Sequence, residues 1–359
     1  MTEQARQPEL RWDSGTAYDF FASLLVIHMP GDYGLRASWA AGIRSRLTAG
    51  AREIFSTAVL HLGMPLEWLS TLPGPKNARA ILDLLEGMPP ESILPTVAFT
   101  PRKHEQCEDI CRGILRNGRW NPEDLEAYRK CIGPAHVKSI EAKPDSIERW
   151  LDAWSRPAEF GTAWRAGLRE YYEVFFREEE RRIQHDLERA LAMARELSSR
   201  LSVAELFEEL SQGIRVEYHL SQRSLLLVPC YWCSPRILYT SLSSDEEIVL
   251  FGARPPEASL IPGDTVPAML LLALEALSDP TRLSILRTVI AEPLTQADIA
   301  RRLRLRPPTI SHHLKSLRIA GLIAYIGTGK DETRYGARLQ RIEEACAALT
   351  GFLGVKKAG

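Results

Sequence analysis

Apolar residues recur at helical spacing along most of this chain, and the pattern changes only once before its last quarter. From residue 16 to residue 211, apolar stripes broken by Pro and Gly predict a succession of helices, the longest over 160–200. Short runs rich in branched and aromatic residues then predict an antiparallel β-meander, with strands at 214–220, 224–229, 236–241 and 247–252. A proline-rich segment, 253–266, follows as a linker.

Helical spacing resumes at residue 267, and the last quarter of the chain holds two short helices close together. The segment 294–303, LTQADIARRL, starts at Thr295, a residue type that caps helix N-termini. The segment 307–325, PPTISHHLKSLRIAGLIAY, follows after a short turn and carries its apolar stripe at Ile310, Leu314 and Leu317. Two short helices with a tight turn, the second having a polar outer face, predict a helix-turn-helix.

Two β-like runs come directly after the second helix. They span 323–326 and 332–335, and the residues between them, Gly-Thr-Gly-Lys-Asp, are typical of a turn. A hairpin in this position is a wing, and it would carry Lys330 and Arg334 near its tip.

Over residues 268–338 the chain resembles the winged-helix domain of ArsR-type bacterial repressors. The resemblance is carried by LEALSDPTRLSILRTV at 274–289, by the two helices just described, and by the wing ending at Arg334-Tyr335. It implies a homodimer that binds a near-palindromic operator in double-stranded DNA. The flanking helices, 267–278 and 338–352, are the expected dimer elements. The full layout is similar to a subgroup of these regulators that has a large helical N-terminal domain of unknown function.

The polar face of the second helix supplies the candidate DNA contacts. Short donors and acceptors on a helix in the major groove meet base edges, and cations meet phosphates. The base-edge candidates are Thr309, Ser311 and His312, with His313 and Ser316 beside them. The phosphate candidates are Arg304, Arg306, Lys315, Lys330 and Arg334. Four further residues are assigned to this interface: Thr295, Gln296, Arg318 and Tyr335.

These patterns predict a mainly α fold with a small antiparallel β-meander, in three parts. Residues 1–212 form a helical domain for an effector or a partner, and residues 213–262 hold the meander and the linker. Residues 263–359 form the winged helix-turn-helix domain for DNA binding and dimerisation. We therefore expect a transcriptional regulator, a repressor, whose operator binding is modulated through the N-terminal domain. No cofactor is expected, and the effector has no signature in the sequence.

The cysteines leave a sensing alternative open. In ArsR-type metal sensors, cysteines stand at the start of the helix before the turn, or acids and histidines stand in the last helix. This chain has no cysteine in the segment 292–296 and no histidine in 338–352. Zinc binding or thiol chemistry would instead use Cys107 and Cys111 together with Cys230 and Cys233. Packing as small buried residues is the other interpretation of all four.

Composition limits the remaining classes of function. The chain has 359 residues, of which 45% are hydrophobic and 25% are charged, and no apolar run reaches the ~18–20 residues of a membrane span. The polar N-terminus is not typical of a secretory signal, so we expect a cytoplasmic protein without a disulfide framework. Residues 263–359 carry 14 basic and 9 acidic residues, whereas the whole chain has a net charge of −1. This asymmetry favours DNA binding by the C-terminal part.

Catalytic motifs are missing from the sequence. It holds no phosphate-binding glycine loop, no His-Glu-x-x-His and no Gly-x-Ser-x-Gly. We therefore expect no enzyme, and an enzyme fused to a DNA-binding domain stays as a second alternative. The 210 N-terminal residues, rich in tryptophan, have room for a small-molecule pocket, a dimer surface or a partner surface, although core packing is the safer interpretation of these aromatic residues.

Overall fold

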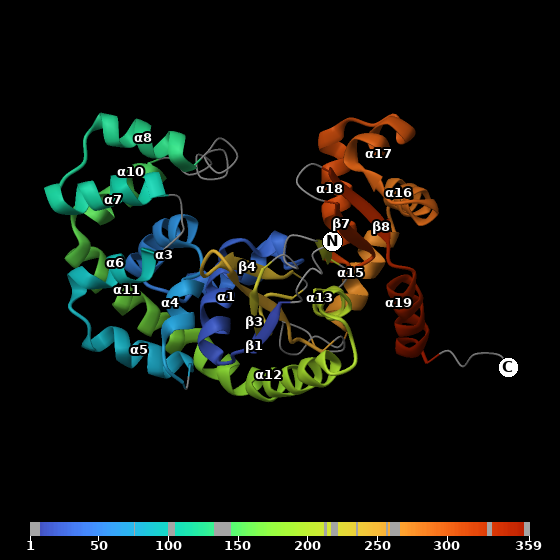
Figure 1. The fold of residues 1–359 in the computed structure, drawn as a ribbon, viewed down its shortest axis with the longest axis horizontal. Coiled ribbons are helices and arrows are strands. Elements are labelled where there is room, and N and C mark those ends of the chain that lie inside the picture. The colour runs from blue at the N-terminus through green and yellow to red at the C-terminus, as the bar shows by residue number, and fades with distance from the viewer. Residues whose placement is uncertain are drawn as a thin grey trace, which may run out of the picture.

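The structure is a computed structural model. It describes residues 8–74, 76–99, 105–132, 145–211, 214–216, 222–234, 236–255, 258, 266–328 and 332–354. These residues form two separate hydrophobic cores, one built from residues 17–253 and one from residues 276–323. We call the part around the first core the body and the part from Ala268 to Phe352 the winged-helix domain. The two lie side by side (Figure 1). None of the described helices combines the length and apolar character that crossing a membrane requires.

Short helices make up most of the body, as the broken apolar stripes predict. Its first half contains α1 (Thr16–His28), the 3-10 turn η1 (Pro30–Asp32), α2 (Ala37–Ser45), α3 (Ala49–Leu62), α4 (Leu66–Thr71), α5 (Ala78–Gly87) and α6 (Pro90–Ala98). Its second half contains α7 (Glu105–Asn117), α8 (Pro122–Ile132), α10 (Ser146–Ser155), α11 (Pro157–Tyr171), the π-helical turn η2 (Tyr172–Phe176), α12 (Arg177–Ser198) and α13 (Val203–Leu210).

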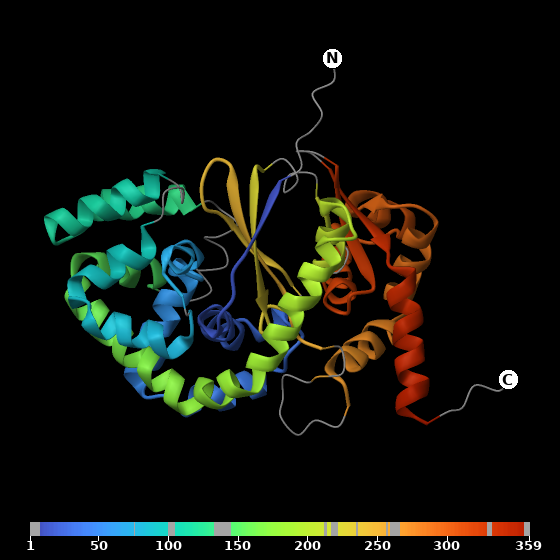
Figure 2. The ribbon, with the colours of Figure 1, turned by 60° about the horizontal axis from the view of Figure 1, so that its bottom comes forward.

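The long helix expected at 160–200 is a continuous helical run, α11-η2-α12, that curves under the body (Figure 2). Its aromatic residues pack around Phe20 of α1, whose ring centroid lies 5.5 Å from that of Tyr171 and 5.1 Å from that of Phe176. Both rings are fully buried. The aromatic stripe is therefore core packing that joins the end of α11 and the start of α12 to α1.

A four-stranded sheet lies at the centre of the body, in the order β1-β3-β5-β4. Its strands are β1 (Glu9–Trp12), β3 (Ser224–Cys230), β4 (Leu238–Ser241) and β5 (Glu246–Gly252). β1 and β5 pair with β3 in parallel, and only β4 with β5 is antiparallel. The predicted four-strand meander over 214–252 is therefore wrong. β3 and β5 are buried along almost their whole length, which is typical of parallel strands covered on both faces.

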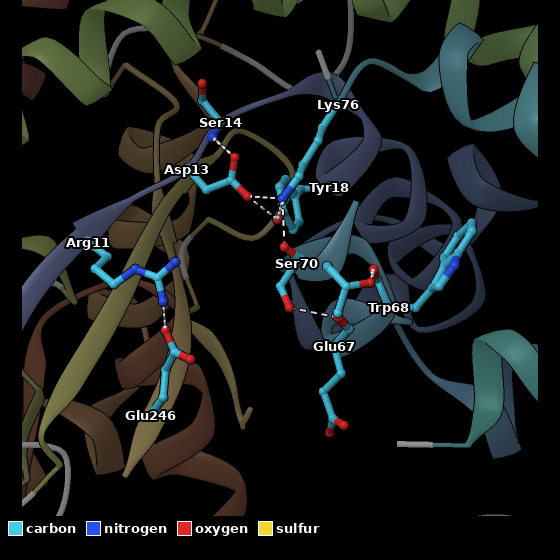
Figure 3. A network of polar contacts seen from close by, with 10 residues as sticks. Arg11, Asp13, Ser14, Tyr18, Glu67, Trp68, Ser70, Lys76 and Glu246 are labelled. Atoms are coloured by element: carbon cyan, nitrogen blue, oxygen red, sulfur yellow. Dashed lines mark hydrogen bonds and ion pairs between the residues drawn. The ribbon is translucent and has the colours of Figure 1, made fainter. Parts of the chain in front are cut away.

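A polar network fastens the end of β1 to α1 (Figure 3). The carboxylate of Asp13 accepts hydrogen bonds from the hydroxyl of Tyr18, at 2.7 Å, and from Lys76, which also donates to the carbonyl of Ser70 at 3.0 Å. Gly15 lies between strand and helix with a φ of 152°, and a Cβ there would come within 2.0 Å of the carbonyl oxygen of Lys76. Only glycine fits this close approach.

The winged-helix domain contains α15 (Ala268–Leu277), α16 (Pro280–Ala291), β6 (Leu294–Thr295), α17 (Gln296–Leu303), α18 (Pro307–Ile319), β7 (Ile323–Thr328), β8 (Glu332–Ala337) and α19 (Leu339–Phe352). β7 pairs with β8, and β8 with β6, in an antiparallel sheet. The prediction of a mainly helical chain with a small antiparallel sheet and a C-terminal winged helix-turn-helix is thus confirmed. One strand was assigned to the wrong sheet, because β2 (Ile214–Val216) pairs in parallel with β7.

Candidate nucleic-acid interface

The two helices of the helix-turn-helix are fixed by contacts among their first residues. The Oγ1 of Thr295 accepts a hydrogen bond from the N–H of Asp298 at 3.2 Å, which caps α17. The side-chain amide of Gln296 donates to the carbonyl of Pro307 at 2.9 Å and so ties the start of α17 to the start of α18. Both side chains are therefore used inside the domain, where they position α18.

α18 buries one face and leaves the other open, as its sequence predicts. Ile310, Leu314 and Leu317 are at most 2% exposed and belong to the core of the winged-helix domain. Thr309, Ser311 and His312 are exposed near the N-terminal end of the helix, and Arg304 and Arg306 are exposed in the turn before it. The first half of α18 thus presents short polar groups with cations beside them, the arrangement that base edges and phosphates require.

Two of the predicted contacts on α18, His313 and Arg318, lie away from this open face. The side chain of His313 is 12% exposed, and its Nδ1 lies 3.8 Å from a carboxylate oxygen of Asp279 at the start of α16. Arg318 is half-buried, and burial lowers the pKa of its guanidinium. Ser316 stays on the face of His312, one turn further along, and its hydroxyl donates to the carbonyl of His312 at 3.3 Å. Consecutive residues of a helix point in different directions, so His312 and His313 do not share a face.

The wing contains two of the other candidates. Tyr335 of β8 lies opposite Tyr325 of β7, with ring centroids 5.7 Å apart in an edge-to-face arrangement, and it is half-buried. Arg334 lies opposite Thr295 in the pairing of β8 with β6. The pKa of Asp298 is lowered mainly by the hydrogen bond from the Thr295 side chain, and the positive charge of Arg334 contributes in the same direction. Lys330 falls outside the described residues.

The body touches the second half of α18. Lys315 forms an ion pair with Asp32 of η1, and the same carboxylate lies 3.5 Å from Arg236. One turn further on, Ile319 lies against Gly34, where a Cβ would come within 3.1 Å of the Ile319 side chain. Together with the pairing of β2 with β7, these contacts place the body beside the candidate DNA-reading helix, next to one of its predicted phosphate contacts.

Sequence reasoning found the open face of α18 but missed this contact. Asp32 appears in the sequence within a Pro-Gly-Asp turn, and Arg236 appears in a predicted strand. Neither carries a local signal of a partner, because each is far along the chain from Lys315. Only the folded arrangement brings the three charges together.

The cysteines do not form the group that the sensing alternative needs. Cys107 of α7 makes a single disulfide bond with Cys131 of α8, although the sequence predicts no disulfide framework, and Cys111 is a buried free thiol. Cys230, the last residue of β3, and Cys233 are fully buried. β3 lies at the centre of the body, whereas α7 lies at its far left end in Figure 1. In the described part of the chain, no three side chains of His, Cys, Asp or Glu converge as metal ligands.

Cys230 belongs to a buried polar cluster around Asp19 of α1. One carboxylate oxygen of Asp19 accepts hydrogen bonds from the backbone N–H of Trp232, at 2.8 Å, and from the thiol of Cys230, at 3.4 Å. Burial raises the pKa of Asp19 to about 7, and these hydrogen bonds oppose the rise. The cluster therefore holds the chain after β3 against α1, which is a structural role for both residues.

Comparisons with known proteins agree with the geometry of the C-terminal domain. Residues 277–326 match a family model described as a helix-turn-helix domain. Among solved structures, the chain is similar to an ArsR-like transcriptional regulator from Rhodococcus sp. RHA1, with 30% identity and a TM-score of 0.23, covering 24% of this chain and 80% of that chain. It is also similar to NolR from Sinorhizobium fredii, with 23% identity and a TM-score of 0.22, covering 28% of this chain and 99% of that one. A search of curated proteins found no match.

The C-terminal part of this chain is a DNA-binding helix-turn-helix domain. The resemblance to ArsR-type regulators that its sequence shows is confirmed there, with α17 and α18 as the two helices and β7 and β8 as the wing. The family match ends at residue 326 and begins at residue 277, so it says nothing about the body.

Proposed function

We propose that this protein is a cytoplasmic transcriptional repressor that binds an operator as a homodimer and whose DNA affinity is controlled by its body. The observation that supports DNA reading is the open polar face at the start of α18, where Thr309, Ser311 and His312 lie beside Arg304 and Arg306. A neutral histidine in the groove donates or accepts a hydrogen bond without bringing a charge out of water. The proposal assigns no enzymatic reaction to the chain.

The surface of α19 supports the homodimer. None of its residues is buried, and it packs against α15 and, through Ile342, against the core of the winged-helix domain. Large apolar side chains remain open at its two ends, where Leu339 is 55%, Phe352 is 48% and Leu353 is 63% exposed. A second copy of the chain would cover them, and dimers of helix-turn-helix proteins read half-sites ~34–36 Å apart.

The ion pair between Lys315 and Asp32 supports control by the body. Lys315 is a candidate phosphate contact, and in this structure a carboxylate occupies the place next to its ammonium group. DNA must displace that carboxylate, because a phosphate and an aspartate repel each other at the same cation. The pair is partly exposed and is worth only about 0–1 kcal/mol. A small movement of η1 would therefore change DNA affinity without unfolding either part.

Salt-titrated DNA binding tests this function. A duplex is first selected from a random library by the purified full-length chain. Lys315→Ala should weaken binding to the selected duplex and to a scrambled one alike, and should reduce the slope of log affinity against log salt by about one. His312→Ala should weaken binding to the selected duplex by about 1–3 kcal/mol and leave binding to the scrambled duplex unchanged.

Two outcomes would contradict the proposal. One is a chain that binds no duplex at low salt, and the other is an equal loss on both duplexes for His312→Ala. Repression in particular is read by transcription from a promoter that carries the selected site. The amount of transcript should fall as the protein is added, and a rise would show an activator instead.

The disulfide bond supports a second candidate, a thiol-responsive regulator. Cys107 and Cys131 join α7 to α8, so reduction would release one end of the body. In that case Cys131→Ser and reduced wild-type protein should share one DNA affinity, different from that of oxidised wild-type protein. Equal affinities for all three would exclude this candidate.

A further inference from the structure

The body contains a cavity of about 300 Å³ at its end opposite the winged-helix domain. It lies between the C-terminal ends of α3 and α6 and the helices α7, α8 and α10, which stand together at the upper left of Figure 1. This volume is at the lower end of the range for small-molecule pockets. Most of the lining is apolar or aromatic: Leu60, Leu62, Ala98, Phe99, Cys111, Tyr128, Ile132, Trp150 and Trp154.

Aromatic rings give the cavity walls a defined geometry. Trp154 stacks on Phe99 with ring centroids 4.7 Å apart, and Trp150 stacks on His61 with centroids 5.2 Å apart. The two indoles stand nearly perpendicular to each other, at 88°. Flat apolar surfaces held at fixed angles favour an aromatic ligand, because its ring gains stacking and edge-to-face contacts in addition to burial.

Two indole N–H groups among the lining residues, those of Trp150 and Trp154, are buried without a hydrogen-bond partner among the described residues. Trp154 is 2% exposed. A buried indole N–H normally has an acceptor, and leaving it unpaired is unfavourable. An oxygen acceptor on the ligand, such as a ketone, would supply the missing partner.

The charges around the cavity favour a neutral ligand. Glu108 is the only carboxylate among the lining residues that the structure describes, and it is paired with Arg112. The guanidinium of Arg112 lies in turn 3.9 Å from the ring centroid of Phe99. Because the acid is already neutralised by its neighbour, an ion of either sign would enter the cavity without a free partner.

The free thiol in the wall is not arranged for covalent capture. Cys111 is 5% exposed, and burial raises its pKa to about 12. At neutral pH it is therefore a thiol and not the reactive thiolate. A ligand in this cavity would therefore bind without a covalent bond to Cys111.

We propose that this cavity binds a neutral aromatic molecule carrying a hydrogen-bond acceptor, and that this molecule is the effector of the regulator. The second part rests on the proposed function. A packed route leads from the cavity to the DNA-reading helix: α3 ends in the cavity wall and packs on α1, and α1 leads directly into η1. Occupation of the cavity would move α3, and with it the turn that places Asp32 against Lys315.

Fluorescence titration with prodan, a neutral naphthalene ketone, tests the site without DNA. The full-length chain should bind prodan saturably at one site per chain, with a blue shift of its emission. Trp154→Phe keeps an aromatic ring but removes the N–H, and it should weaken prodan binding about five- to tenfold. The same variant should leave dimethylaminonaphthalene, which lacks the ketone, bound as in the wild type.

Two variants control for folding and for the location of the site. Trp164→Phe makes the same change in a tryptophan that is equally buried but does not line the cavity, and it should leave prodan binding unchanged. Ala98→Phe fills the cavity and should abolish binding of both compounds. Leu238→Phe, in a smaller cavity of about 200 Å³ near β4, should affect neither.

The outcomes separate the site from its role. If Trp154→Phe and Trp164→Phe change prodan affinity equally, or if Ala98→Phe still binds prodan, the assignment of the binding site to this cavity is wrong. If the site stands, saturating prodan should change the affinity for the selected duplex in the wild type and not in Ala98→Phe. An unchanged affinity would overturn the effector role. A chain that binds prodan as described but binds no DNA would refute the proposed function and leave the site in place.

Discussion

The two parts of this molecule draw their cores from very different distances along the chain. The buried core of the winged-helix domain lies within residues 276–323, and most of its elements, such as α17 with α18 and β7 with β8, pack on a neighbour in sequence. The core of the body reaches from Ala17 to Ala253, and its central sheet pairs Glu9 with Ser224. The first part can therefore form from local contacts, whereas the second requires both ends of a long segment to meet. We expect the two to unfold as separate units, joined by a weak interface.

Leu317→Ala tests this independence and has the largest expected effect. Leu317 is fully buried in the core of the winged-helix domain, and removing its side chain should cost that domain about 2–5 kcal/mol. Calorimetry of the full-length chain should show one transition that moves down and another that stays in place. Leu168→Ala, at an equally buried leucine of the body, should move the other transition instead. Two transitions that always move together would mean that the parts unfold as one unit.

Asp19→Asn tests whether pH acts on the body alone. The folded pKa of Asp19, about 7, lies above the ~3.9 of an unfolded chain, so the folded state keeps its proton to higher pH. The stability that this proton provides is complete below the unfolded pKa and is lost as pH rises through 7. From pH 5 to pH 8 the body should lose about 2–3 kcal/mol relative to Asp19→Asn.

The winged-helix domain serves as the internal control for this measurement. Its transition should follow the same pH profile in the wild type and in Asp19→Asn, because the carboxylate lies in the core of the body. Thermal unfolding at several pH values, followed for both transitions, gives the comparison. A body transition with equal pH profiles in the two proteins would show that Asp19 is ionised in the folded state.

The difference between local contacts in the winged-helix domain and long-range contacts in the body also decides how much of each part could be predicted from the sequence. The helix-turn-helix was predictable because its signals are local: the cap at Thr295, the stripe on α18 and the turn of the wing. The exposed positions of Thr309, Ser311 and His312 followed from that stripe. Neighbours such as His313 and Arg318 could not be placed so well, since their burial depends on α16 and on the body.

Strand partners in the body, and contacts between distant segments of the chain, were not predictable by the same reasoning. β1 lies in a polar N-terminal stretch that does not predict a strand. The residue pattern of β2 is similar to that of the other β-rich runs, although β2 pairs with β7 in the winged-helix domain. A strand's own residues fix its faces but not its partner, which depends on what the rest of the chain covers. The contact between Asp32 and Lys315 could not be predicted for the same reason.

Asp32→Asn acts on the interface between the two parts. It releases Lys315 and removes a negative charge from the region that DNA must approach. Affinity for the selected duplex should rise about two- to fivefold, because a partly exposed ion pair is worth about 0–1 kcal/mol. Asp245→Asn makes the same change of charge at a surface pair with Arg223, and it should have a smaller effect. Equal gains for both variants would mean that only net charge matters.

Among the described residues, the body and the winged-helix domain each contain one non-glycine residue with a positive φ. The two residues differ in how readily their side chains allow this backbone conformation. Asp145 has a φ of 60° and Arg304 a φ of 54°. Aspartate adopts this left-handed conformation more readily than arginine, because its short side chain can bond to the nearby backbone. Arg304→Gly should therefore stabilise the winged-helix domain by about 0.5–1 kcal/mol, and Asp145→Gly should stabilise the body by less.

Arg304→Gly also separates stability from DNA binding, since it removes a candidate phosphate contact. Arg306→Gly is the matched control: it removes the same charge from the same turn, but at a φ of −73° that needs no glycine. Both variants should lose DNA affinity to a similar degree and lower the salt slope by about one, whereas only Arg304→Gly should raise the domain's melting temperature. If both variants instead lower the melting temperature, the turn gains more from the arginine side chain than it loses to backbone strain.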